Sequence, residues 1–182
     1  MKIIFYMLAT AAIFSAQNAS AQEEVSALSR QSFKNGLGLH AGAATGLGFS
    51  YRYFPEKWGI QVTGIPVFNG DKNYFASSAI SVLYKIKEHK KVDLFGYLGN
   101  HLIFQRYQEY LYYPDPWPDP WVEPEPTYTT SRRYNVALGV GVNIQLWEIL
   151  DLSLQAGYGL SSYNNSPLTT LLSGEIGLYY KF

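Results

Sequence analysis

The chain has 182 residues, with 14 Lys and Arg against 14 Asp and Glu, no cysteine, and 16% aromatic residues. Balanced charge leaves no basic footprint for nucleic acid, so we expect no nucleic-acid partner. The absence of cysteine excludes a disulfide-stapled scaffold, and the length suffices for one domain.

The first residues have the layout of a secretory signal peptide. Lys2 precedes an apolar run over residues 3–14, and Ala19, Ser20 and Ala21 supply the small-x-small pattern of a cleavage site. The run is too short to cross ~30 Å of hydrocarbon as a helix. We therefore predict a cleaved signal peptide over residues 1–21, a short N-terminal periplasmic segment over 22–34, and a folded part over 35–182.

The folded part alternates large apolar residues with small or polar ones. From Tyr134 to Leu146 every second residue is aromatic or aliphatic, and the residues between them are Gly, Ala, Asn or Gln. Residues 150–160 and 176–182 repeat the pattern. Because side chains of a strand point alternately to opposite faces, this period of two predicts strands.

In chain order, the predicted strands span residues 35–45, 46–54, 58–68, 74–87, 92–112, 128–147, 149–163 and 169–182. Short charged connections at 55–57, 88–90 and 148–149 alternate with longer ones rich in turn formers at 69–73, 114–127 and 164–167. The turn at Thr45 and Gly46 is the exception, because it is short. In residues 92–107 both faces carry apolar residues, so the outward face of that strand stays open.

The second face of these strands is mostly Gly, Ser, Ala, Asn and Gln, which suits the crowded interior of a narrow barrel better than a solvated surface. Its few charged residues are expected to pair inside as a lumen polar network; they are Arg52, Lys85, Asp151 and Glu175. The glycines of the sixth and seventh strands are expected to leave room there for water or a small apolar ligand.

Aromatic residues gather near both ends of the strands, as in the girdles at the two membrane–water interfaces. Lipid offers no hydrogen-bond partner, so a sheet can cross it only when no strand edge is left unpaired. No segment after the signal is a credible membrane-spanning helix. The sequence therefore predicts an all-β fold: a closed, eight-stranded, antiparallel transmembrane β-barrel in an up-and-down meander.

The end of the chain carries the most specific pattern, with Ile176, Leu178 and Tyr180 at alternate positions before a final Phe182. Here the chain resembles the small outer-membrane β-barrel family of Gram-negative bacteria, the OmpA/OmpX-like and OmpW-like group. The resemblance covers residues 22–182. It implies that these four residues are an assembly signal for the barrel-insertion machinery, and that outer-membrane lipid and lipopolysaccharide surround the protein in the bacterial outer membrane.

One connection, over residues 113–127, contains Pro-Asp-Pro-Trp twice in tandem. Because proline fixes φ and removes a donor, we expect a stiff extended loop on the extracellular side. Trp117, Trp121, Asp115 and Asp119 are its candidate partner contacts, since Trp is enriched at binding hot spots. Alternatively, the Trp rings pack on lipid head groups or on the rim of the barrel.

The sequence shows no catalytic constellation. His89 lies in a charged turn, and His40 and His101 lie in strands that can face the lumen. No metal-ligand spacing or phosphate-binding glycine loop indicates a cofactor. We predict a non-enzymatic barrel with a structural, adhesive or complex-forming role, including that of accessory subunit in a larger outer-membrane complex. Two alternatives stay open: a narrow channel or small apolar-ligand transporter, and a lipid A-modifying enzyme with a His and a Ser or Asp near the outer rim.

Overall fold

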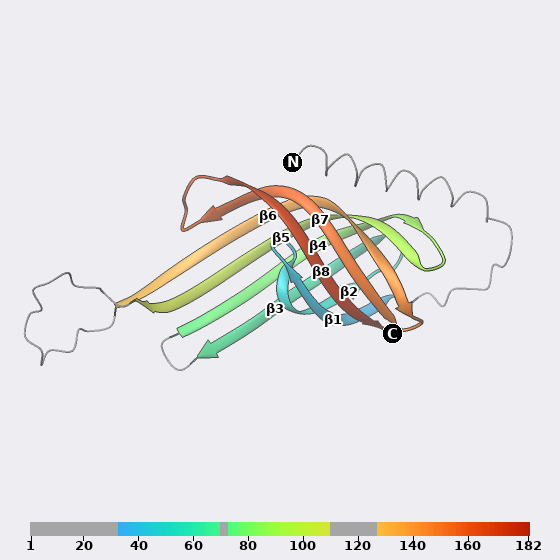
Figure 1. The fold of residues 1–182 in the computed structure, drawn as a ribbon, viewed down its shortest axis with the longest axis horizontal. Coiled ribbons are helices and arrows are strands. Elements are labelled where there is room, and N and C mark those ends of the chain that lie inside the picture. The colour runs from blue at the N-terminus through green and yellow to red at the C-terminus, as the bar shows by residue number, and fades with distance from the viewer. Residues whose placement is uncertain (1–32, 70–72, 110–126) are drawn as a thin grey trace, which may run out of the picture. The chain divides into compact units, whose positions relative to one another are not determined.

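The structure is a computed structural model that describes residues 33–69, 73–109 and 127–182. These residues form one closed antiparallel barrel (Figure 1). Its strands are β1 (Asn35–Gly42), β2 (Gly46–Tyr53), β3 (Trp58–Asn69), β4 (Asn73–Glu88), β5 (Val92–Glu109), β6 (Thr127–Trp147), β7 (Leu150–Tyr163) and β8 (Thr169–Lys181).

Each strand pairs with the next along the chain, and β1 closes the ring by pairing with β8, where Leu37 lies opposite Tyr180. The eight-stranded meander predicted from the alternation is confirmed. Closure gives every strand two neighbours, as a sheet in lipid requires. In the described part of the chain, no helix is long and apolar enough to cross a membrane.

The polarity of the barrel is inverted relative to that of a water-soluble protein. Outward side chains are large and apolar, such as Leu138 and Leu172 with 67% and 83% of their surface exposed, while most buried residues are polar. In water such a surface would be an apolar patch far beyond what monomeric proteins expose. The bilayer is therefore the solvent of the outer face, and the fold is a transmembrane β-barrel.

The structure answers which face of β5 points outward. Phe95 and Tyr97 are buried in the lumen, whereas Leu94, Leu98 and Leu102 point outward. Together with Leu83, the two aromatic rings form the apolar cluster of the interior, and Phe54 packs against it. This cluster fills the lumen toward the end where the short charged connections lie.

The glycines of β6 and β7 face these rings. A Cβ added at Gly141 would lie 2.5 Å from Cζ of Phe95, and one at Gly139 would lie 2.6 Å from Cε1 of Tyr97. Real Cβ atoms essentially never come so close. The prediction that these glycines leave room for water or a small apolar ligand is wrong, because the side chains of β5 occupy that space.

The strands differ greatly in length. β1 and β2 have 8 residues each, whereas β5 and β6 have 18 and 21 and pair as far as Glu109 and Thr127. The β5–β6 hairpin therefore extends well beyond the β1–β2 hairpin (Figure 1). The candidate partner contacts Trp117, Trp121, Asp115 and Asp119 lie outside the described residues, as does the predicted signal peptide.

Candidate functional site: the polar lumen and its inner turn

The turn between β1 and β2, residues 43–45, lies inside the lumen; we call it the inner turn. Ala44 and Thr45 have no exposed surface. Gly46 and Gly48 adopt φ of +93° and +124°, which few residues other than glycine tolerate. A Cβ at Gly46 would lie 2.7 Å from Cβ of Ala79 on β4. The start of β2 thus bends across the interior before it joins the wall.

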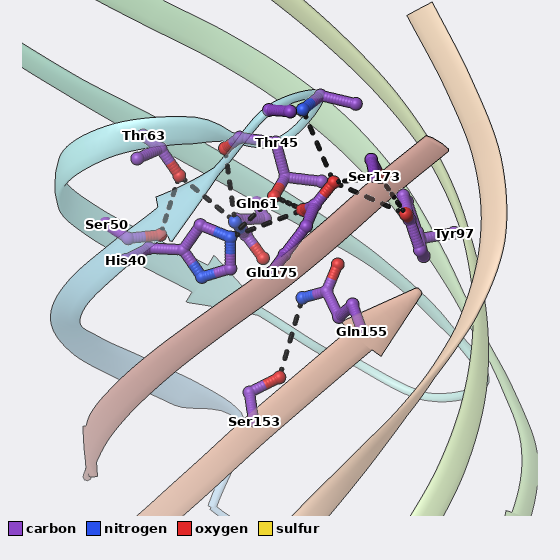
Figure 2. Close-up of polar contacts among 12 residues, drawn as sticks. His40, Thr45, Ser50, Gln61, Thr63, Tyr97, Ser153, Gln155, Ser173 and Glu175 are labelled. Carbon is purple, nitrogen blue, oxygen red and sulfur yellow. Dashed lines mark hydrogen bonds and ion pairs between the residues drawn. The ribbon is translucent and has the colours of Figure 1, made fainter. Parts of the chain in front are cut away.

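Side chains from three strands hold the inner turn. The carbonyl of Ala43 accepts hydrogen bonds from Nδ1 of His101 at 2.8 Å and from Nδ2 of Asn135 at 2.6 Å. The backbone N–H of Ala44 donates to Oε1 of Glu175 at 3.3 Å, and the hydroxyl of Thr45 donates to Oε2 of the same carboxylate (Figure 2). These bonds pair the Ala43 carbonyl, the Ala44 N–H and the Thr45 hydroxyl of the turn, as the burial of polar groups requires.

Glu175 on β8 is the central acceptor of the lumen. Besides the inner turn, its Oε1 accepts from Ser173 at 2.8 Å and from the Tyr97 hydroxyl at 3.3 Å (Figure 2). Nε2 of His40 lies 3.5 Å from its Oε2. The Glu175 carboxylate thus connects the inner turn to Tyr97 on β5 and to Ser173 on its own strand.

A chain of hydrogen bonds links Glu175 to the predicted lumen residue Arg52. Because Thr45 donates its proton to Glu175, it accepts from Nε2 of His40 at 2.5 Å, and Nδ1 of His40 then accepts from Tyr179 at 3.1 Å. The chain continues through Ser50 and Thr63 to Gln61, whose Oε1 accepts from Nε of Arg52 at 2.7 Å. Aligned donors of this kind polarise one another.

Arg52 ties together strands from opposite sides of the barrel. Its two terminal nitrogens donate to Asn143 on β6 at 2.9 Å and to Ser153 on β7 at 3.0 Å. Its guanidinium lies 3.9 Å from the centre of the Tyr179 ring, a cation–π contact that is strong where water is excluded. The guanidinium is therefore held by neutral partners and an aromatic face.

The other two predicted members of the lumen polar network lie apart from this chain. Asp151 pairs with Lys181 at 2.9 Å, and Lys85 pairs with Glu88 at 2.6 Å near the turn between β4 and β5. The structure thus brings Arg52 and Glu175 together through hydrogen-bond relays and gives Asp151 and Lys85 separate partners. The sequence analysis expected that His40 can face the lumen, but it did not indicate Thr45, Tyr97 and Tyr179 as members of the network.

Thr45, His40 and Glu175 are residue types that hydrolases combine for nucleophilic catalysis. Here, however, Thr45 is 0% exposed, and its hydroxyl proton points at Glu175 rather than at His40. A nucleophile needs both a substrate path and a base that takes its proton. This arrangement serves to hold the inner turn. No group of three or more potential metal ligands occurs among the described residues.

The predicted assembly-signal residues lie on the outer face of the last strand. Ile176, Leu178 and Tyr180 point outward, and the rings of Tyr180 and Phe182 stack with centroids 6.3 Å apart. The backbone N–H and C=O of Phe182 pair with Asn35 at the start of β1. These residues therefore form part of the closing seam of the barrel, and their recognition by insertion machinery stays a prediction.

No family model and no curated protein matches the chain. The solved structures similar to it include the N-terminal β-barrel domain of Pseudomonas aeruginosa OprF, with 12% identity, 81% of this chain and 94% of that chain covered, and a TM-score of 0.44. Ail, the attachment invasion locus protein of Yersinia pestis, shows 14% identity, 81% and 95% coverage, and a TM-score of 0.40. Neisserial surface protein A shows 21% identity, 81% and 94% coverage, and a TM-score of 0.35.

Proposed function

We propose that the chain is an integral outer-membrane β-barrel of a Gram-negative bacterium, with a structural, adhesive or complex-forming role through its outward end and no catalysis. The observation that carries this proposal is the filled lumen. Eight strands enclose an interior only just wide enough for side chains. Here the inner turn, the Glu175 relay and the rings of Phe95 and Tyr97 occupy it. Because side chains fill the lumen, the outward end of the barrel is the part that can contact a partner.

The outer-membrane location draws support from both ends of the sequence. The pattern of residues 1–21 fits export through a signal peptide, and the alternation that ends at Phe182 fits insertion by the barrel-insertion machinery. The apolar outer face of the strands fits a lipid setting for the part of the barrel that carries it.

Lipopolysaccharide is the proposed lipid partner on the outer side. Arg106 and Arg132 lie on the outward face of the β5–β6 hairpin, beyond the outward Tyr134, and stack on Tyr128 and Phe104 at 4.9 and 5.9 Å. The described residues offer neither guanidinium a carboxylate partner. Phosphate groups of outer-leaflet lipids would complement this charge.

The loop over residues 113–127 is the proposed contact for a protein partner, because the longest hairpin of the barrel carries it outward. Trp117 and Trp121 would be the anchors, with Asp115 and Asp119 beside them. Deleting residues 114–126 should leave insertion intact and abolish partner capture. The test is purification in mild detergent followed by mass spectrometry of every protein that co-migrates.

A matched control replaces residues 114–126 with a Gly/Ser linker of the same length, which keeps the spacing but removes the Trp and Asp side chains. We expect this variant to lose the same partners as the deletion. If both variants keep every association of the parent protein, the loop is not the contact.

A further inference from the structure

The wall of the barrel has a gap beside the inner turn. β1 pairs with β8 only as far as Gly42 opposite Glu175, and β2 pairs with β3 only as far as Phe49 opposite Gly64. Beyond these pairs, residues 169–174 of β8 and 65–69 of β3 keep their partners on β7 and β4. Among the described residues, no strand lies between them. We call this gap the lateral notch.

The notch is wide on the scale of a sheet. Two strands are missing between β8 and β3 there, and among the described residues neither β8 nor β3 has a strand partner on the side that faces the gap. It exists because Gly46 and Gly48 turn the end of the β1–β2 hairpin into the lumen. The hairpin that could have completed the wall forms the floor of the notch instead.

The notch opens at the outer boundary of the hydrocarbon. Counted along β8 from Phe182, Leu172 is the eleventh residue, the last of the ~9–11 that a tilted strand needs to cross it. Its rim is apolar, since Leu172 is 83% exposed on one side and Phe68 is 74% exposed on the other. Pro66 has no backbone N–H, which removes one unpaired donor from the edge of β3.

Behind the notch lies a cavity of about 250 Å³, which we call the vestibule. Ala43 of the inner turn lines its floor, and Leu47 and Leu171 line it on the side of the notch. His101, Asn135 and Arg133 line it from the opposite strands β5 and β6. The vestibule therefore reaches from the lateral notch across the lumen to the far wall.

The far wall carries a positive charge with no acidic partner. Arg133 has no carboxylate within ion-pair distance among the residues described, and its guanidinium lies 5.5 Å from the Tyr163 ring. It also lines an adjoining cavity of about 180 Å³ with Ser131, whose buried hydroxyl has no hydrogen-bond partner. The described walls of the two cavities thus offer a cation and an unsatisfied hydroxyl, which fit an anionic head group.

We propose that the lateral notch admits a single-chain anionic amphiphile of the fatty-acid class from the bilayer. Its chain would lie between Leu47 and Leu171, and its carboxylate would pair with Arg133 and accept from Ser131. The vestibule is near the lower end of the ~300–1,000 Å³ typical of ligand sites. It therefore suits one acyl chain rather than a whole two-chain lipid. The proposal depends on the barrel lying in a bilayer, and not on the role of the outward loop.

The test is a binding titration of the full-length mature barrel in phosphatidylcholine nanodiscs with cis-parinaric acid, a fatty acid whose fluorescence rises in an apolar site. We expect saturable binding to one site. Leu171→Trp fills the notch and should lower affinity at least tenfold, while the adjacent Leu172→Trp points into lipid and should bind like the parent protein.

A second matched pair tests the charge. Arg133→Gln should weaken binding about tenfold or more, because a charge-assisted hydrogen bond contributes at least that much. Lys87→Gln removes an exposed cation on β4 near the turn between β4 and β5, away from both cavities, and should change nothing. The methyl ester of the probe should bind the parent protein as weakly as the free acid binds Arg133→Gln.

Equal affinity of Leu171→Trp and the parent protein would overturn the proposal. An equal loss of probe affinity in Leu171→Trp and Leu172→Trp would also overturn it, because that result would show that the probe binds around the outside of the barrel. Circular dichroism of each nanodisc sample reports folding. If Leu171→Trp does not fold, Leu47→Trp closes the notch from the other side and, with Arg133→Gln, decides the question.

Discussion

Glu175 is the residue on which the interior depends most. Its carboxylate accepts from the backbone of the inner turn, from Thr45, from Ser173 and from Tyr97, and its side chain has no exposed surface. A buried polar group that loses its hydrogen-bond partner is left unpaired, and the free energy that it lost on leaving water is then not recovered. A single substitution here therefore disturbs several strands at once.

We expect Glu175→Ala to lower the free energy of unfolding by about 3 kcal/mol or more, because several buried donors lose their acceptor and each unsatisfied buried group costs about 1–3 kcal/mol. Urea unfolding of the refolded barrel in detergent micelles, followed by circular dichroism, measures this change. Lys85→Gln is the control, because the Lys85–Glu88 pair is partly exposed and such pairs contribute only about 0–1 kcal/mol. Equal losses in the two variants would contradict the central place of Glu175.

Among the elements of the barrel, the β1–β2 hairpin is the one whose structure is least predictable from its own sequence. Residues 43–45 are two alanines and a threonine, with no charge and no strong turn former. Their burial depends on donors from β5, β6 and β8 that are distant in the sequence. The two closely spaced glycines, Gly46 and Gly48, were the one local signal that the chain bends here.

The bend of this hairpin can be tested at Gly46. Gly46→Val places a side chain at φ of +93° and against Ala79, so the inner turn should leave the lumen. We expect the free energy of unfolding in urea to fall by about 2 kcal/mol or more, because His101, Asn135 and Glu175 would lose the partners that the inner turn provides. Gly174→Val is the matched control, since a Cβ there meets nothing within 4 Å. A Gly46→Val barrel as stable in urea as the parent protein would show that the inner turn does not help to hold the interior together.

The other strands were predictable because their alternation decides their orientation. In β6, β7 and β8 most large apolar residues point outward, as expected when one face meets lipid, and Tyr179 and Leu171 of β8 are exceptions on the inner face. β5 could not be oriented from sequence, since Phe95 and Tyr97 make its inner face as apolar as its outer face. For the same reason, the space opposite Gly139 and Gly141 could not be known to be filled.

The candidate site was predictable only in part. Charged residues on a face of small residues identified Arg52 and Glu175 as inward-facing, because a charge in lipid is costly. Their connection runs through His40, Ser50 and Tyr179, and depends on which strands face each other across the lumen. The alternation gives the face of a side chain but not its partner across the barrel.

For the whole molecule, one physical relation explains both the fold and the proposed role. The outside is apolar and meets lipid, and the inside is polar. Closure of the sheet pairs most of the backbone, but not at the lateral notch, and side chains pair most of the buried polar groups of the lumen. Where the inner turn leaves the wall incomplete, the vestibule meets the lateral notch. Because lipid covers the outer face and side chains fill the inside, the surface that can bind a protein partner is concentrated at the outward end.

Spin labelling at adjacent positions tests this relation most directly, and the lack of native cysteine makes single labels straightforward. Leu160 points outward and Ser161 lines the vestibule. In lipid vesicles we expect a nitroxide at Leu160→Cys to collide readily with dissolved oxygen and hardly with a water-soluble nickel complex, and one at Ser161→Cys to show the opposite order. If the nitroxide at Leu160→Cys is as accessible to the nickel complex as the one at Ser161→Cys, the outer face does not meet lipid and the account is wrong.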